Sequence, residues 1–549
     1  MNKFIISALL VVAFSANAFA QKFTYAVHFK DKGQHKNMEQ AARLALSEYS
    51  INKKGERHIP LTVSDLPVNA DYLQQLAQQD IDILLTSRWM NLAVISTHME
   101  QEVLLKQFSF ISSVQELTNT SPSTVNLSAR KFNAANNEPA TTAVDYGNTQ
   151  AQIALMNLDC LHNKGYQGTG SLVAVFDTGF LGVDTISAFD SIRLQNRFIA
   201  TRNFVNPAQS VYSTDLHGTM VFSTMAGNRP GNFVGAAVNA SYALAITENL
   251  GTETHQEEYN WLAAAEWADS MGADVIQSSL SYKYFDAGQG DYTEAQLDGK
   301  TAIITNAARM AASKGIIVVN SAGNDGTLPP PLSKKISPPC DADSILAVGS
   351  VDANGLYHDI SSIGNTADGR LKPDVVAMGR NTWILNNRGT ALQNSGTSFA
   401  APLISGLVAC LKQANPQRSY WEIMRAVTVS ANRLNNPDVY YGYGIPDACK
   451  ADSLLKTYNS VNEPSFSLKN KLLLFPNPSS YFTTLTSVDP SVKISQVNIF
   501  SVNGQLIQHH SASSAFETTI DLRSLASGIY LVEVKTTTGL ASVLKLVKE

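Results

Sequence analysis

A serine, a histidine and an aspartate of this chain stand at positions from which a fold could bring them together for nucleophilic chemistry. Ser398 lies in N-S-G-T-S-F-A-A-P, residues 394–402, directly before an apolar run that continues to residue 411. The small and apolar residues of that run predict a buried helix, so Ser398 would lie at the positive N-terminal end of the helix. A serine hydroxyl is a poor nucleophile at neutral pH, and a base must remove its proton.

Asp177 and His217 are candidates for the two partners that such a serine needs. Asp177 ends the apolar run 172–176, and a carboxylate at the C-terminal end of a parallel strand faces the crevice of an α/β sheet. His217 precedes a short helical pattern that ends at Gly227. Its imidazole can accept the Ser398 proton and later deliver it to a leaving amine. Asp177 would fix the imidazole tautomer and stabilise the imidazolium.

The chain order Asp177, His217, Ser398 resembles that of the subtilisin-like serine proteases and differs from the orders of chymotrypsin and the α/β-hydrolases. The resemblance covers roughly residues 145–451 and includes S-A-G-N-D-G, in which Asn324 aligns with the family's oxyanion-hole asparagine. It implies that the Asn324 amide and the Ser398 backbone N–H stabilise the tetrahedral oxyanion, a contribution of about 2.7–4 kcal/mol in subtilisin.

The resemblance extends to A-D-V-I-Q-S-S-L-S-Y, which is similar to the family's strand that pairs with the substrate backbone. It implies that Ser279, Leu280 and Ser281 line the first specificity pocket, with an extended peptide laid against them. Ser281 stands where the family usually has Gly, so the width of the pocket and the approach of the backbone are left open.

Each of these residues also has an ordinary structural interpretation when it is taken alone. His217 is one of 10 histidines, Asn324 stands beside turn glycines, and Ser398 could only cap its helix, a role worth ~1 kcal/mol. The D-T-G tripeptide also occurs in aspartic proteases, but that mechanism pairs two carboxylates and the chain has no second D-T-G or D-S-G. Four signals in one consistent order therefore favour a catalytic site.

Around these residues, strand patterns alternate with helical patterns, which predicts βαβ units and an α/β fold with a parallel sheet flanked by helices. The segment L-K-P-D-V-V-A-M-G also resembles the family's strand that leads toward the serine. We expect this catalytic domain at residues 145–456. The expected strands are 172–176, 242–246, 275–280, 316–319 and 345–351, and the expected helices are 259–271, 301–313, 397–414 and 420–430.

The first part of the chain predicts export and a separate domain. Lys3, the apolar run 4–14 and A-F-A ending at Ala20 are typical of a secretory signal peptide, residues 1–20. No later segment reaches the ~20 apolar residues of a transmembrane helix, so we expect a soluble mature protein. Residues 21–144 have strand and helix patterns of their own and predict a small α+β domain.

By the family resemblance, residues 21–144 are a propeptide that acts as chaperone and inhibitor, with a cleavable linker near residues 121–142. An accessory binding domain is the competing interpretation. Residues 457–549 show short alternating strands, and Asn503–Gly504 is a hairpin turn signal, which together predict a small β-sandwich. These residues resemble the C-terminal sorting domain of the type IX secretion system. On physical grounds alone they could equally bind carbohydrate or protein.

Composition agrees with a secreted protein of about three domains and argues against a nucleic-acid partner, since the net charge is −5 and no strongly basic run occurs. Four cysteines allow three full pairings, and Cys410 in the apolar helix is a candidate buried thiol. Relatives often bind calcium, but no loop shows a convincing run of oxygen ligands, so we expect no cofactor and no metal.

The sequence thus predicts a secreted or cell-surface serine endopeptidase that cleaves polypeptides through an acyl-enzyme. Its expected partners are polypeptide substrates, its own propeptide and the type IX secretion machinery, and we expect a monomer. One alternative is a secreted binding or adhesion protein on an inactive protease scaffold. Another is an esterase or peptide ligase that uses the same residues.

Overall fold

A computed structural model describes residues 23–548, except for residues 34–36, 58, 80, 98–104, 118–143, 458–471, 476, 480, 488–491, 502–504, 516 and 538–540. The expected signal peptide, the linker at residues 121–142 and the Asn503–Gly504 turn lie outside the described residues. The chain divides into two compact units, Met1–Lys456 and Thr457–Glu549.

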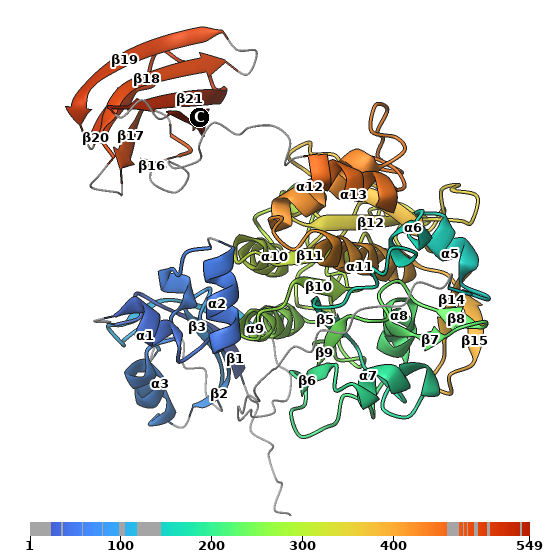
Figure 1. The fold of residues 1–549 in the computed structure, drawn as a ribbon. Helices are drawn as coiled ribbons and strands as arrows, with labels where there is room; N and C mark the ends of the chain where they lie inside the picture. The colour runs from blue at the N-terminus through green and yellow to red at the C-terminus, as the bar shows by residue number, and fades with distance from the viewer. Residues whose placement is uncertain are drawn as a thin grey trace, which may run out of the picture. The chain divides into compact units, whose positions relative to one another are not determined.

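The centre of the first unit is a parallel sheet of seven strands in the order β13-β12-β11-β10-β5-β9-β6 (Figure 1). Its inner strands β5 and β12 are largely apolar and buried at every residue, as expected for strands covered on both faces. In chain order the strands are β5 (Leu172–Asp177), β6 (Phe198–Asn203), β9 (Ser241–Ile246), β10 (Val275–Ser278), β11 (Ile317–Ser321), β12 (Leu346–Val351) and β13 (Val375–Met378).

Helices cover both faces of this sheet. Two helices, α9 (His255–Ser270) and α10 (Ile303–Ser313), pack against each other and against β5 and β11. On the other side, α8 (His217–Ala226) packs against α11 (Thr397–Ala414), which crosses β10 to β13 and also contacts α12 (Tyr420–Ser430). The structure therefore confirms the predicted α/β sheet flanked by helices.

Smaller elements complete this region: α5 (Gln150–Ala154), α6 (Asp159–His162), α7 (Asp190–Leu194), β7 (Asn228–Arg229), β8 (Phe233–Val234), β14 (Thr382–Leu385), β15 (Ala391–Asn394) and α13 (Ala448–Thr457). Cys160 in α6 and Cys449 in α13 form a disulfide, one of the pairings that the sequence left open. Cys410 is a buried free thiol, and so is Cys340.

The sheet differs from the expectation in two strands. Residues 198–203 were not expected as a strand, and β6 is a partly exposed edge strand without the apolar run that marks the inner strands. β10 ends at Ser278, before residue 280, because the polar groups of the next residues bond outside the sheet. The Ser279 hydroxyl donates to the Ser398 carbonyl, and the Leu280 carbonyl accepts from Asn320.

The N-terminal region of the first unit is an α+β domain with an antiparallel sheet in the order β2-β3-β1-β4. Strands β1 and β3 form its centre, because β1 pairs with β3 and β4, and β3 also pairs with β2. Its elements are β1 (Phe23–Phe29), α1 (Met38–Ala42), α2 (Glu48–Glu56), α3 (Ala70–Ala77), β2 (Asp82–Ser87), β3 (Leu92–Thr97) and β4 (Ile111–Leu117).

The second unit consists of two antiparallel sheets that share one apolar core, as predicted for a β-sandwich. Leu485 and Ile520 from one sheet and Val497, Val532 and Leu546 from the other belong to this core. The first sheet has β16 (Leu472–Phe475), β17 (Phe482–Ser487) and β20 (Glu517–Asp521), and the second has β18 (Ile494–Ser501), β19 (Leu506–Ala515), β21 (Gly528–Thr536) and β22 (Ala541–Lys548). Among the described residues of either unit, no helix has the length and apolar character needed to cross a membrane.

Candidate active site

Asp177 and His217 meet at the carboxyl edge of the sheet. Asp177 is the last residue of the inner strand β5 and is fully buried, while His217 is the first residue of α8. The His217 Nδ1 and Asp177 Oδ1 atoms are 2.7 Å apart. Because a carboxylate only accepts hydrogen bonds, Nδ1 carries the hydrogen and the neutral ring keeps Nε2 as an acceptor. This is the tautomer that a general base for serine needs.

The charge of Asp177 also sets the basicity of His217. Burial lowers the pKa of His217, but the negative charge of Asp177 and the hydrogen bond to it outweigh burial, so the pKa of His217 is raised above its ordinary value. The raised pKa means that Asp177 stabilises the imidazolium, the form in which the ring holds a proton taken from serine.

Asp215 holds this pair in place, and the sequence interpretation did not single it out. Asp215 Oδ2 accepts from the His217 backbone N–H at 2.9 Å and from the Thr178 hydroxyl at 2.7 Å. The Thr178 backbone N–H donates to Asp177 Oδ1 at 2.8 Å. Asp215 therefore links the start of α8 to the end of β5. The available signal was the Asp two residues before His217, a spacing at which aspartate often bonds its own backbone.

Ser398 lies at the N-terminal end of α11, where the sequence placed it, and is 7% exposed. Its backbone carbonyl accepts from the Ser279 hydroxyl at 2.9 Å. The next residue, Phe399, has its ring centroid 6.1 Å from that of His217. The first backbone N–H groups of a helix have no partner within the helix, so the Ser398 N–H is a donor at this point.

Asn324 reaches the residue directly before Ser398. Its side-chain oxygen accepts from the backbone N–H and from the hydroxyl of Thr397, each at 3.0 Å. Because both contacts use the amide oxygen, the Nδ2 hydrogens are left to donate to another acceptor. Thr397, which the sequence interpretation did not select, thus fixes the direction in which the exposed Asn324 amide presents its donors.

The three residues predicted for the specificity pocket follow the end of β10. Ser279 and Leu280 are buried and Ser281 is exposed. The Ser279 hydroxyl accepts from Gln277 Nε2 at 2.9 Å and donates to the Ser398 carbonyl, so Ser279 connects the pocket segment to the start of α11.

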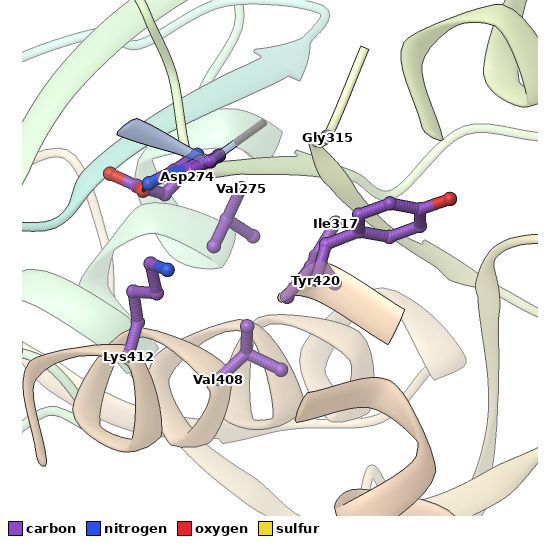
Figure 2. A pocket seen from close by; sticks show the side chains of 8 residues that line it. Asp274, Val275, Gly315, Ile317, Val408, Lys412 and Tyr420 are labelled. Atoms are coloured by element: carbon purple, nitrogen blue, oxygen red, sulfur yellow. Dashed lines mark hydrogen bonds and ion pairs between the residues drawn. The ribbon is translucent and has the colours of Figure 1, made fainter. Parts of the chain in front are cut away.

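A cavity at the other end of α11 is separate from this site (Figure 2). Val408 and Lys412 come from α11, Val275 and Ile317 start β10 and β11, and Asp274 precedes β10. Ser398 and Lys412 are 14 positions apart, or about 21 Å along a helix at 1.5 Å per residue. The cavity therefore lies at the amino edge of the sheet, and the four candidate catalytic residues lie at the carboxyl edge.

The N-terminal domain makes buried ion pairs with the catalytic region near this amino edge. Asp274 pairs with Lys53 at 2.7 Å and with Arg57. Arg88 pairs with Asp269 at 2.6 Å and with Glu266 at 3.4 Å, and both acids lie in α9. Every one of these side chains is largely buried, so the two regions interact through desolvated charges.

One group of side chains has the chemistry of a metal site. Ligand oxygens of Glu248, Glu253 and Glu257 all lie within 4.8 Å of one another. They do not form a regular run of oxygen ligands in one loop, which is the pattern whose absence led to the expectation of no metal.

The chain matches three known families in three successive segments. Residues 24–134 match the Peptidase S8 propeptide domain of Bacteroidota, residues 168–444 match the Subtilase family, and residues 473–549 match the secretion system C-terminal sorting domain. These matches confirm the propeptide rather than an accessory binding domain, and a sorting domain rather than a general binding module.

The chain is also similar to individual proteins. The chain is 28% identical to Subtilisin DY of Bacillus licheniformis over 53% of this chain and 94% of that protein. It is 30% identical to Subtilisin NAT of Bacillus subtilis subsp. natto over 55% of this chain and 70% of that protein. Among solved structures, MycP1 from Mycobacterium smegmatis matches 59% of this chain and 89% of that chain, with 23% identity and a TM-score of 0.45.

Three observations lead to one assignment. The chain has a parallel sheet flanked by helices, a propeptide precedes this sheet, and the family match covers about half of the 549 residues. The chain belongs to the subtilase family and is a subtilisin-like serine endopeptidase with a propeptide and a sorting domain that directs it to the cell surface or the exterior.

Proposed function

We propose that this endopeptidase cleaves polypeptides through an acyl-enzyme formed on Ser398. The Ser398 hydroxyl attacks the scissile carbonyl carbon while His217 Nε2 takes its proton. The carbonyl oxygen becomes an oxyanion, which accepts hydrogen bonds from Asn324 Nδ2 and the Ser398 backbone N–H. The C–N bond then breaks, and His217 returns the proton to the leaving amine. Water repeats these steps on the ester and releases the acid.

The observation that carries this proposal is the 2.7 Å contact between His217 Nδ1 and Asp177 Oδ1. It selects the ring tautomer that leaves Nε2 as the base. The contact between Asn324 and Thr397 supports the same mechanism, because it directs amide donors toward the start of α11. Ser279, Leu280 and Ser281 would form the pocket for the residue before the cleaved bond.

Hydrolysis of an unfolded protein such as casein by purified, matured enzyme tests this mechanism. Ser398→Ala should lower turnover by about 10⁶-fold, as in subtilisin, and leave the fold unchanged. Ser313→Ala is a matched control, because Ser313 is an exposed serine at the end of α10 whose hydroxyl donates to the nearby Met310 carbonyl. Full activity of the Ser398→Ala protein would refute the assignment of Ser398 as the nucleophile, whereas an inactive wild-type protein would favour a binding protein on a protease scaffold.

We further propose that residues 457–549 route the protein through the type IX secretion system and that the mature enzyme acts as a monomer. The sorting-domain match at residues 473–549 supports the first statement. The second statement is supported by the fact that a single chain supplies every candidate catalytic residue. Deletion of residues 457–549 should retain the protein inside the cell, and size-exclusion chromatography with light scattering should give the mass of one chain.

A further inference from the structure

Two chain segments leave neighbouring strands of the sheet beside Ser398. Residues 279–281 follow β10, and residues 322–325 follow β11, which pairs with β10 in parallel. Both segments contact the start of α11, the first through Ser279 and the second through Asn324. Because the proposed acyl group is attached to Ser398, the substrate side chain before the cleaved bond would lie against these two segments.

An ion pair connects the two segments. Lys283 lies two residues beyond the first segment, Asp325 ends the second, and Lys283 Nζ is 2.5 Å from Asp325 Oδ2. The Lys283 side chain is 2% exposed, whereas the Asp325 side chain is 22% exposed. The pair therefore consists of a lysine inside the protein and a carboxylate that reaches the surface next to Asn324.

The ammonium group of Lys283 is fully bonded. Its Nζ also donates to the Ser333 carbonyl at 3.1 Å and to the Lys335 carbonyl at 2.7 Å. An ammonium has three N–H donors, and these two carbonyls together with Asp325 accept all three. Burial lowers the pKa of Lys283, and the hydrogen bond and the charge of Asp325 oppose that shift. Asp325 thus helps to keep Lys283 charged, and Lys283 has no donor left for an acidic substrate side chain.

Other contacts hold the carboxylate of Asp325 in this position. The oxygen that pairs with Lys283 also accepts from the Ser337 hydroxyl at 3.2 Å, and the Asp325 backbone N–H donates to the Ser362 hydroxyl at 3.0 Å. Asp325 is the charged residue of the two segments, since the others are Ser, Leu, Ser, Ala, Gly and Asn. The charge beside the pocket is therefore paired within the protein before a substrate binds.

We propose that Lys283 determines specificity by pairing with Asp325, so that the enzyme prefers an uncharged substrate side chain before the cleaved bond. This inference rests on the proposed function, because it concerns the substrate of the same site. Without Lys283, Asp325 would present an unpaired carboxylate to the pocket. A carboxylate of this kind binds the ammonium of a lysine or the guanidinium of an arginine.

A purely structural role for this ion pair makes a different prediction. Lys283 bonds residues of three separate segments, so its loss could loosen them and lower the rate for every peptide to the same extent. A role in specificity instead changes the ratio of the rates for a basic and an apolar peptide. The ratio, rather than the rate itself, therefore separates the two roles.

Peptides that differ only in the residue before the cleaved bond test the proposal, with Leu, Gln, Lys or Glu at that position. Matured parent enzyme at pH 8 should cleave the Leu and Gln peptides with a higher kcat/KM than the Lys and Glu peptides. Lys283→Met should raise the Lys-to-Leu ratio of kcat/KM by about 10-fold, the value of a charge-assisted hydrogen bond. Adding Asp325→Asn to this variant should remove the gain. Lys334→Met, at an exposed lysine nearby, should keep the ratio of the parent.

A parent enzyme that cleaves the Lys peptide as fast as the Leu peptide would overturn the proposal, even if the Lys283→Met protein did not fold. An unchanged ratio in a Lys283→Met protein that circular dichroism shows to be folded would also overturn it, and so would an equal gain in the single and double variants. Cleavage of none of the peptides by the parent would refute the proposed function itself. A raised ratio in Lys283→Met that the added Asp325→Asn abolishes would establish the role of Lys283.

Discussion

Charged side chains at the two edges of the central sheet differ in how completely other side chains of the protein pair with them. At the amino edge, Asp274 has two basic partners from the propeptide, Lys53 and Arg57, and also accepts from the Leu172 backbone N–H at 2.9 Å. At the carboxyl edge, Asp177 fixes one nitrogen of His217 and leaves the other as an acceptor. Helix α9 shows the same contrast along its length, since Glu266 is paired with the basic Arg88, whereas Glu257 bonds a hydroxyl and a second acid.

This difference separates side chains that stabilise the folded chain from side chains that could take part in catalysis. Burial alone would raise the pKa of Asp274, but the charges of Lys53 and Arg57 outweigh burial and hold it well below its ordinary value. Side chains of the propeptide thus pair with the acids at the amino edge, and these ion pairs hold the propeptide against the catalytic region. The carboxyl edge keeps donors and acceptors available for groups that are not part of the chain. Changes at the two edges should therefore affect different measurements.

The largest effect is expected for Asp177→Asn. Without the carboxylate, His217 loses its orienting acceptor and the imidazolium loses its stabilising charge, so kcat should fall by about 10⁴-fold. Asp177 raises the pKa of His217, so its removal lowers that pKa, and the acid limb of kcat/KM should move to lower pH. Rate measurements from pH 4 to 9 check both statements. A limb that stays in place would show that His217 is not the base.

Asn324→Ala should reduce kcat by about 10²–10³-fold with little change in KM, because the lost hydrogen bond forms to the oxyanion and not to the bound substrate. Steady-state kinetics on a chromogenic peptide measure this. Asn354→Ala, at an exposed turn, serves as the control. A rise in KM without a fall in kcat would place Asn324 in substrate binding instead.

At the propeptide contact, Arg88→Ala should weaken inhibition and leave kcat of the mature enzyme unchanged. Removing Arg88 leaves Glu266 buried without its cation in the complex, a loss of about 3–5 kcal/mol for a buried pair. The inhibition constant of the propeptide added to mature enzyme should rise by at least about 10²-fold. Arg43→Ala, which removes exposed pairs within the propeptide, should have little effect. Equal constants for the two variants would contradict a charged contact.

The smallest expected effect is a difference in thermal stability between the two buried acids of α9. Glu266→Gln removes the acceptor of Arg88 and should lower the Tm of the full-length Ser398→Ala protein. Glu257→Gln should change the Tm of the same protein little at pH 7, because burial and the neighbouring acids raise the pKa of Glu257 to about 10 and its carboxyl carries no charge there. Calorimetry at pH 7 measures both. Equal losses of Tm in the two variants would show that the two acids do not differ in the way described.

The sequence predicted the parts of the fold that have continuous apolar runs. The inner strands β5, β9 and β12 consist mostly of apolar residues, and α11 is a long, largely apolar helix, so each was expected within a few residues. β6 was missed because an edge strand is partly exposed and mixes Arg202 and Asn203 with apolar residues. Local pattern does not distinguish such a strand from a loop.

The candidate site could be inferred for a different reason. Asp177, His217, Asn324 and Ser398 stand in short motifs whose order resembles one family, and the structure pairs two of them, Asp177 and His217. The positioning residues Asp215 and Thr397 were missed because their function depends on contacts made only in the folded chain.

Labelling with a fluorophosphonate that reacts only with activated serines tests the triad most directly. Mass spectrometry of the matured protein should find one adduct on Ser398, and no adduct in Ser398→Ala. His217→Ala should react far more slowly, because its serine has no base. An adduct on another serine, or equally fast labelling of Ser398 in the His217→Ala protein, would contradict the assignment of Asp177, His217 and Ser398 as the catalytic triad.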